Sequence, residues 1–286
     1  MWPDVIAVLS AMGWASDAVL VRLGARRSNV LAAAFLSFSV SVLCLWLYLL
    51  LFSSLDLLWS RATIYFLLSG CLQPLMARVL FYIGLMRLGA SRAGPLRGVE
   101  PLFSAAIAVV FLHERPGFLV YGGTVLIVAS IWLISWRRSG EARWRLFDIV
   151  FPVGAALVSA VSQNLRKGGL LILPDPFVGT AVSTLTSLML FFIFLLATGR
   201  MSLVRIERES LPFFGSAAFV SALAQLLNFM ALSRGEVSAM VPLLNTTPLF
   251  TVLFSSLFLR EVEKVTSRIV LGAGLMVTGV VIITSR

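Results

Sequence analysis

The chain has 286 residues, of which 59% are hydrophobic and only 13% are charged, and its mean hydropathy is +0.98. A soluble domain of this composition would lack the polar side chains needed to cover its surface, so the composition predicts an all-α, polytopic membrane protein. The net charge of +10 does not indicate nucleic acid, because the basic residues are scattered at the ends of apolar runs. Basic residues in such places favour contact with lipid headgroups, and the bilayer is the expected partner.

Ten apolar runs are long enough to cross a bilayer. In chain order we expect them at residues 4–22, 30–52, 62–87, 93–112, 117–136, 148–166, 177–198, 210–233, 238–259 and 268–284. The chain begins without the basic segment of a cleaved signal peptide, so the first run is expected to remain as a membrane helix. The basic connection at residues 137–145 divides the chain into two predicted units of five helices, residues 1–138 and 139–286.

One stretch of sequence occurs twice. Residues 81–114 align without a gap over residues 228–261, with identical residues at eleven positions that include two prolines, an arginine and a glutamate in each copy. Residues 2–24 also align over residues 146–168, which places Arg22 on Arg166. These matches indicate a duplication.

Five helices in each unit is an odd number, so equivalent helices must cross the membrane in opposite directions. The sequence therefore predicts two inverted five-helix repeats (5+5), an architecture that commonly serves alternating access to a site near the middle of the bilayer.

The 5+5 plan, the duplicated stretch with its terminal Glu114 and Glu261, and the first-helix segment GWASDAVLVRLG resemble the drug/metabolite transporter superfamily, specifically its EamA-like ten-helix proteins. The resemblance covers essentially the whole chain. It implies a transporter without a cofactor, in a family whose members export amino acids, drugs and other metabolites, and a location in a bacterial inner membrane.

Charged side chains inside the predicted helices are the first candidates for a substrate site. Arg78 lies nine residues from the helix end at Arg87, which corresponds to roughly 13 Å of helix, close to the middle of the bilayer. An arginine at that depth is costly in lipid, so Arg78 should face the interior of the bundle. Glu100 lies at a similar depth, whereas Asp17 and Arg97 are expected to be shallower. An alternative is that Arg78 pairs with Glu100 or Asp17 only to hold helices together.

The positions aligned with these charges in the second repeat are neutral and polar. Gln225 stands in place of Arg78, and Asn245 and Thr246 occupy the stretch that aligns with Gly98 and Val99. The sequence therefore predicts one substrate site with a charged wall and an amide and hydroxyl wall, formed by Arg78, Glu100, Asp17, Arg97, Trp14, Gln225, Asn228, Asn245, Thr246 and Gln163. We expect Arg78 to hold an anionic group and Glu100 or Asp17 to hold an amino group or a coupling proton.

Prolines interrupt the two copies of the duplicated stretch. Because proline removes a backbone hydrogen bond and kinks a helix, we expect gating at Pro95, Pro101, Pro242 and Pro248. Six glycines are expected to allow close helix approach: Gly70, Gly84, Gly122, Gly123, Gly272 and Gly274.

No catalytic, metal-binding or nucleotide-binding pattern accompanies the one histidine, His113, so the sequence predicts neither an enzyme nor an ATP-driven pump. It favours a secondary transporter, an exporter or exchanger, of small polar metabolites that are amino-acid-like or carry a carboxylate. A flippase that recognises the phosphate of a lipid headgroup is the alternative. A coupling proton or an exchanged solute is the expected further partner, and both a monomer and a homodimer remain open.

The basic residues are distributed unevenly between the connections. The odd-numbered connections contain 15 of them, whereas the opposite side contains six, among which we count Arg166 and Lys167. By the positive-inside rule both termini are expected to be extracytoplasmic, although the family resemblance implies cytoplasmic termini.

Overall fold

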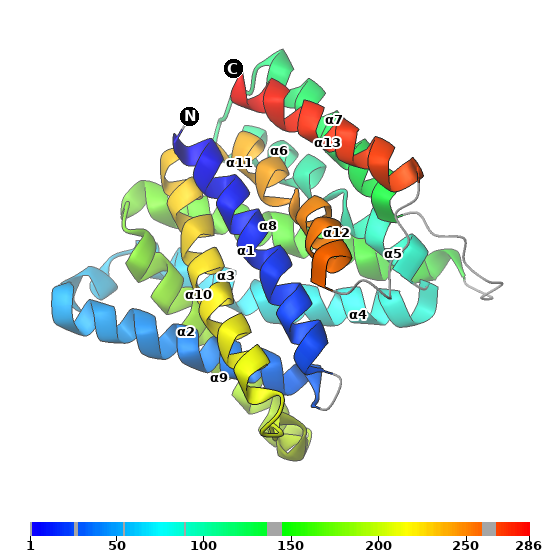
Figure 1. Cartoon of the computed structure of the whole chain (residues 1–286). Helices are drawn as coiled ribbons and strands as arrows, with labels where there is room; N and C mark the ends of the chain where they lie inside the picture. The colour runs from blue at the N-terminus through cyan, green and yellow to red at the C-terminus, as the bar shows by residue number, and fades with distance from the viewer. Residues whose placement is uncertain (1, 26–27, 54, 89, 136–144, 259–266) are drawn as a thin grey trace.

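The computed structural model describes residues 2–25, 28–53, 55–88, 90–135, 145–258 and 267–286, and these form helices joined by short connections (Figure 1). The first half contains α1 (Trp2–Gly24), α2 (Val30–Phe52), α3 (Ala62–Cys71), α4 (Ala77–Leu88), α5 (Ala90–Arg97), α6 (Glu100–Phe111) and α7 (Phe118–Ser135). The second half contains α8 (Val150–Ile172), α9 (Pro176–Ala197), α10 (Leu211–Arg234), α11 (Val237–Leu244), α12 (Thr247–Phe258) and α13 (Ser267–Thr284). Short turns, η1 (Leu55–Trp59), η3 (Leu146–Ile149) and η4 (Met201–Val204), precede α3, α8 and α10.

Seven of the described segments are long and apolar enough to cross a membrane, and three shorter apolar helices cover residues 62–71, 100–111 and 118–134. The predicted all-helical, multi-pass fold is therefore confirmed. The predicted boundary between residues 138 and 139 lies outside the described residues.

Two of the helices that we predicted from sequence are interrupted next to a proline. The predicted helix at residues 93–112 divides into α5 and α6 just before Pro101, and the one at residues 238–259 divides into α11 and α12 just before Pro248. The prolines at these two positions start the second half of each helix, where a missing N–H costs least. Pro242 lies buried inside α11.

A third break was not predicted. The expected helix at residues 62–87 divides into α3, the π-helical turn η2 (Leu72–Met76) and α4, and Gln73 has an extended backbone with φ −134° and ψ 133°. The cause is Pro74, because proline excludes the helical conformation from the residue before it. The equivalent helix of the second half, α10, is continuous.

The expected end of the sixth helix at residue 166 was wrong. Helix α8 continues to Ile172, and the next helix begins after Asp175, whose carboxylate accepts hydrogen bonds from the backbone N–H groups of Phe177 and Val178. Arg166 and Lys167 consequently lie inside a helix and should not have been counted with the connections.

The two halves pack with a common pattern. Helix α1 lies along α10, as α8 lies along α3 and α4, and α1 contacts α12 as α8 contacts α6 (Figure 1). Helices α7 and α13 lie side by side, where Gly123 and Gly279 each face the backbone of the other helix. Close approach is also found at Gly70, Gly84 and Gly272, whereas the prediction was wrong for Gly122 and Gly274, which face open space.

Both chain ends lie on one side of the molecule, which we call the terminus side, together with the connections at residues 112–117, 173–175 and 235–236 (Figure 1). The largest apolar cluster includes Ile6, Leu49, Phe66, Val178 and Leu232 near this side and continues along α7 as far as Ile134. On the opposite side, which we call the loop side, the described residues form only two small clusters between α1, α2, α9 and α10. Between α1, α2, α9 and α10, the apolar packing is therefore more extensive toward the terminus side than toward the loop side.

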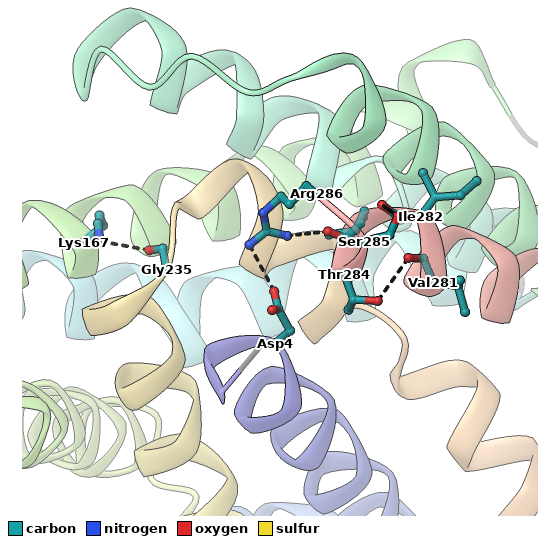
Figure 2. Close-up of polar contacts among 9 residues, drawn as sticks. Asp4, Lys167, Gly235, Val281, Ile282, Thr284, Ser285 and Arg286 are labelled. Carbon is teal, nitrogen blue, oxygen red and sulfur yellow. Dashed lines mark hydrogen bonds and ion pairs between the residues drawn. The ribbon is translucent and has the colours of Figure 1, made fainter.

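Polar contacts reinforce the closure of the terminus side. Glu114 accepts hydrogen bonds from the N–H groups of Val237 and Ser238, at 2.7 and 2.9 Å, and so caps the start of α11. Lys167 donates to the carbonyl oxygens of Leu232 and Gly235 at 2.9 and 2.8 Å. Figure 2 shows the contact to Gly235 together with the 3.0 Å ion pair between Asp4 and the final residue, Arg286.

Candidate substrate site

A polar cavity of about 390 Å³ lies between the two halves of the chain. Both halves contribute equally to its wall, which is formed by Trp14, Gln73, Ala77, Arg78, Phe81, Arg97 and Glu100 from the first half and Gln163, Arg166, Gln225, Asn228, Leu244, Asn245 and Thr247 from the second. Eight of the ten predicted substrate-binding residues are in this list, and the exceptions are Asp17 and Thr246. The structure thus brings together side chains that lie up to 233 positions apart in the sequence.

The breaks in the helices explain why so many polar groups reach this cavity. The break between α5 and α6 places Arg97 at the end of one half-helix and Glu100 at the start of the next, and both line the cavity. The break between α11 and α12 places Asn245 and Thr247 there in the same way. Discontinuous helices of this kind are typical of the binding sites of secondary transporters.

Glu100 is paired with Arg97 and not, as one interpretation of the sequence suggested, with Arg78. The Arg97 guanidinium donates to Glu100 Oε2 at 2.7 Å and to the hydroxyl of Ser159 at 2.6 Å. The three-residue spacing of Arg97 and Glu100 across the α5–α6 break allows this contact. Of the two partners that the alternative interpretation offered for Arg78, Glu100 is therefore excluded, because Glu100 already has a cation beside it.

Arg166 is one of the cavity-lining residues that sequence reasoning missed. Its side chain is 1% exposed, although it lines the cavity, and its guanidinium lies 5.0 Å from the centre of the Phe229 ring. Its hydrogen-bond partners are neutral: Gln163 Oε1 at 3.5 Å and Asn228 Oδ1 at 3.4 Å. Because Phe229 belongs to the terminus-side apolar cluster, Arg166 lies at the closed end of the cavity.

Gln73 also lines the cavity and was not predicted. The break before Pro74 takes Gln73 out of the helix, and its side chain lines the cavity with a buried Oε1 that has no hydrogen-bond partner among the described residues. The signal was present in the sequence as a proline in the middle of an apolar run.

Asp17 lies in a neighbouring, mainly apolar cavity of about 290 Å³ between α1, α2, α9 and α10. Trp14, Arg78 and Gln225 line both cavities and so mark the border between them. Arg78 is the cation whose charge acts on the Asp17 carboxylate, and the described residues give Arg78 no hydrogen bond. Arg78 therefore faces the interior of the bundle, and its surroundings differ from those of Arg97.

Thr246 does not line either cavity. It is 1% exposed, and its hydroxyl donates to the carbonyl oxygen of Leu243 within its own chain segment, whereas the next residue, Thr247, lines the polar cavity. Asn164 donates to Ser104 on α6 and has a structural role. Thr246 and Thr247 are adjacent and point in different directions, so only Thr247 faces the cavity. The sequence alignment of the repeats did not distinguish between the two residues.

The polar cavity is suited to binding a solute. No group of three or more metal-ligating side chains occurs in the described part of the chain. The cavity instead offers guanidinium groups, amides and a hydroxyl, which can hold an anionic or zwitterionic molecule through hydrogen bonds without changing it chemically.

The fold and the cavity together define a multi-pass helical membrane protein with a polar site enclosed between two related halves. A family model described as the EamA-like transporter family matches residues 1–136 and 148–285. The chain belongs to this family, as the resemblance indicated, and so to a family of membrane transporters rather than enzymes. The two matches also correspond to the two halves of the chain.

Comparison with solved structures agrees on the fold. A structure described only as "Crystal structure of protein" superimposes with a TM-score of 0.82 and covers 99% of this chain and 96% of its own, at 14% sequence identity. At that identity the similarity concerns the fold alone. No curated protein sequence matches the chain.

Proposed function

We propose that the protein is a secondary transporter of small polar metabolites that carry a carboxylate, with one site in the polar cavity. The observation that carries this proposal is the cavity of about 390 Å³ between the two halves, whose described lining residues include three arginines but only one carboxylate, Glu100. Glu100 already forms an ion pair with Arg97. Arg78 and Arg166 therefore give the cavity wall an excess of positive charge, which favours an anionic solute. Gln163, Gln225, Asn228 and Asn245 supply the amide groups that would bind the rest of it.

The proposed transport cycle is alternating access between two inverted repeats. In this proposal three pairs of helices each cross the bilayer as one broken helix: α3 with α4, α5 with α6, and α11 with α12. The chain then has ten spans. At the terminus side Glu114 caps the start of α11 and Lys167 binds carbonyl oxygens at the end of α10. In this proposal the present conformation has its gate at the terminus side closed. The breaks beside Pro101 and Pro248 are the positions at which the gating helices would bend, and Pro95 and Pro242 lie in the half-helices next to them.

The charge distribution supports an orientation with the loop side in the cytoplasm of a bacterial inner membrane. Arg166 and Lys167 lie inside a helix, and without them the connections and chain ends of the terminus side contain four basic residues. The excess of basic residues on the loop side, on which this orientation depends, is therefore larger than we first counted. A coupling proton or an exchanged solute would drive transport, and export is the direction that the family favours.

The proposal is tested by counterflow in proteoliposomes. Purified protein is first screened for thermal stabilisation by amino acids, organic acids, sugar phosphates and headgroup analogues, because a ligand that binds the folded state raises the apparent stability. Vesicles loaded with the stabilising compound should then accumulate the labelled compound transiently. Vesicles that show no uptake above protein-free vesicles, for any stabilising compound, would contradict the proposal.

One observation favours the flippase as a second candidate. A smaller, mainly apolar cavity of about 140 Å³ between α2, α4 and α9 is lined by Arg78 together with the exposed side chains of Val30 and Val79. A path that connects an interior arginine to an apolar outer surface would suit a lipid headgroup. Transfer of labelled phospholipid between leaflets in the same vesicles, without counterflow of water-soluble acids, would support this candidate.

A further inference from the structure

A groove on the side of the bundle, which we call the lateral groove, takes no part in the proposed transport cycle. It is the cavity of about 140 Å³ between α2, α4 and α9, and it shares only Arg78 with the polar cavity. Eight of its ten lining side chains are apolar, and the other two are Arg78 and Arg200. Val30, Val79 and Phe194 are 36–42% exposed, so the groove opens to the outside of the bundle. In a membrane this opening faces the acyl chains of the bilayer.

The lateral groove results from the break in the third predicted helix. Helix α9 packs against α2, α3 and η2, but after the break at Pro74 the chain turns away, and α4 packs mainly against α8 (Figure 1). The equivalent helix of the second half, α10, is continuous and packs along both α2 and α9. The pair formed by α2 and α9 is therefore covered by a whole helix on one side and only by the first half of a helix on the other.

The lateral groove has a length and volume that suit part of an acyl chain. Its lining residues on α2 extend from Val30, at the start of the helix, to Phe38, which corresponds to roughly 12 Å of helix. The hydrocarbon core of a bilayer is roughly 30 Å thick, so a groove of this length reaches into one leaflet. A mainly apolar cavity of about 140 Å³ excludes water and accepts an apolar group.

Arg200 supplies a positive charge at the loop-side end of the groove. Helix α9 ends in a Schellman motif, in which Gly199 has a φ of 64° and the N–H groups of Gly199 and Arg200 donate to Leu196 and Leu195 at 3.1 and 2.9 Å. This motif fixes the direction in which the chain leaves α9, and Arg200 forms part of the groove wall. Arg200 is exposed, and no carboxylate pairs with it in the part of the chain that the structure describes. It is thus available to an anion outside the bundle.

We propose that the lateral groove binds an anionic phospholipid of the loop-side leaflet, with its phosphate on Arg200 and part of one acyl chain between α2, α4 and α9. A guanidinium can hold a phosphate through two parallel hydrogen bonds, and a net negative headgroup is preferred because a choline group offsets the charge of its own phosphate. The groove shares Val30, Ala34 and Phe38 with the apolar cavity that contains Asp17, so the bound chain forms part of the outer wall of that cavity. The flippase candidate would carry a lipid through the bundle, whereas this lipid stays in place.

The test compares dioleoyl phosphatidylglycerol with dioleoyl phosphatidylcholine, which have the same acyl chains and differ in net charge. Each lipid is added over a concentration series to the full-length protein in detergent, and binding is measured as thermal stabilisation and as bound copies in native mass spectrometry. Phosphatidylglycerol should bind about 5-fold more tightly, because one arginine beside an anionic lipid contributes a factor of that order. Glycerol 3-phosphate, which has the phosphate but no acyl chain, should not stabilise the protein at the same concentrations.

Variants assign the headgroup and the acyl chain to their contacts. In Arg200→Gln the preference for phosphatidylglycerol should disappear, whereas Arg87→Gln, which removes another loop-side arginine that is half exposed, should keep it. Val79→Trp places a large side chain at the opening of the groove and should weaken binding of both lipids about 10-fold, which corresponds to lost contact with about two methylenes. Leu43→Trp, an equally large substitution at an exposed position of α2 outside the groove, should bind both lipids as the wild type does.

The possible results distinguish the lipid site from its alternatives. Equal binding of the two lipids by wild-type protein, or an unchanged preference in Arg200→Gln, would overturn the assignment of the headgroup. Unchanged binding in Val79→Trp would exclude the groove as the site of the acyl chain, and stabilisation by glycerol 3-phosphate alone would show an anion site without a lipid. Transfer of labelled phosphatidylglycerol between leaflets would contradict a lipid that stays in place. Absent counterflow with an intact lipid preference would instead count against the transporter proposal alone.

Discussion

The ion pair between Arg97 and Glu100 should have unequal effects when either partner is removed. Glu100 is 5% exposed in its side chain and Arg97 is 22% exposed, and their nitrogen and oxygen atoms lie 2.7 Å apart. Arg97→Gln leaves a buried carboxylate without its direct partner, which costs about 3–5 kcal/mol in typical proteins. Because the charge of Arg166 also acts on Glu100, we expect the lower end of that range, about 3 kcal/mol.

Glu100→Gln should cost less. The remaining Arg97 keeps its 2.6 Å hydrogen bond to Ser159 and is more exposed than Glu100, so we expect a loss of about 1–2 kcal/mol. In the double variant the buried carboxylate is no longer present, and its stability should be close to that of Glu100→Gln alone. The two substitutions should therefore be clearly non-additive, as expected for residues in direct contact.

The assay is reversible unfolding of purified protein in mixed micelles, with the free energy of unfolding compared across the four proteins of the cycle. Arg87→Gln is the matched control, because Arg87 forms a 3.0 Å ion pair with Asp148 but is half exposed, so its loss should have a clearly smaller effect. Equal and additive losses for Arg97→Gln and Glu100→Gln would refute the assignment of a buried, directly coupled pair.

Three further predictions concern the closed terminus side, helix packing and orientation. Glu114→Gln should lower stability by about 0.5–2 kcal/mol, because the cap on two N–H groups of α11 loses its charge, and an unchanged unfolding free energy would contradict that role. Gly70→Ala should cost about 1–3 kcal/mol because its Cβ would lie 2.5 Å from the backbone oxygen of Ser183, whereas Gly122→Ala, with no contact within 4 Å, should be tolerated; equal effects would disprove the close approach. A reporter that is active only in the cytoplasm should be inactive when fused after Arg286, and activity there would reverse the orientation.

Much of the site could be predicted because the duplicated sequence supplied a register. The charged stretch around Glu100 indicated where to look in the second half, and Asn245 and Gln225 were found at the aligned positions. Hydropathy and helical rise also placed Arg78 in the interior of the bundle. These inferences depend on local spacing, which the sequence contains.

The remaining features depend on contacts between distant segments. Arg166 and Lys167 resemble a basic helix end, and only the packing of α8 against α10 shows that Lys167 reaches the carbonyl oxygens there while Arg166 is enclosed. The partner of Glu100 could not be chosen from depth alone, because the expected depth favoured Arg78, whereas the break between α5 and α6 brings the shallower Arg97 to Glu100. Gln73 is different, since Pro74 was a local signal that predicts a break in the helix.

Access to the polar cavity tests the central claim most directly, namely that solute crosses the membrane through the site between the two halves. In a background where the exposed Cys44 and Cys71 are replaced by serine, Gln225→Cys places one thiol at the border of the two cavities. A bulky thiol reagent should abolish counterflow in this variant, and the transported solute should protect it, whereas the same reagent at Gly122→Cys should have no effect. Full counterflow after complete modification of Gln225→Cys would contradict transport through this cavity.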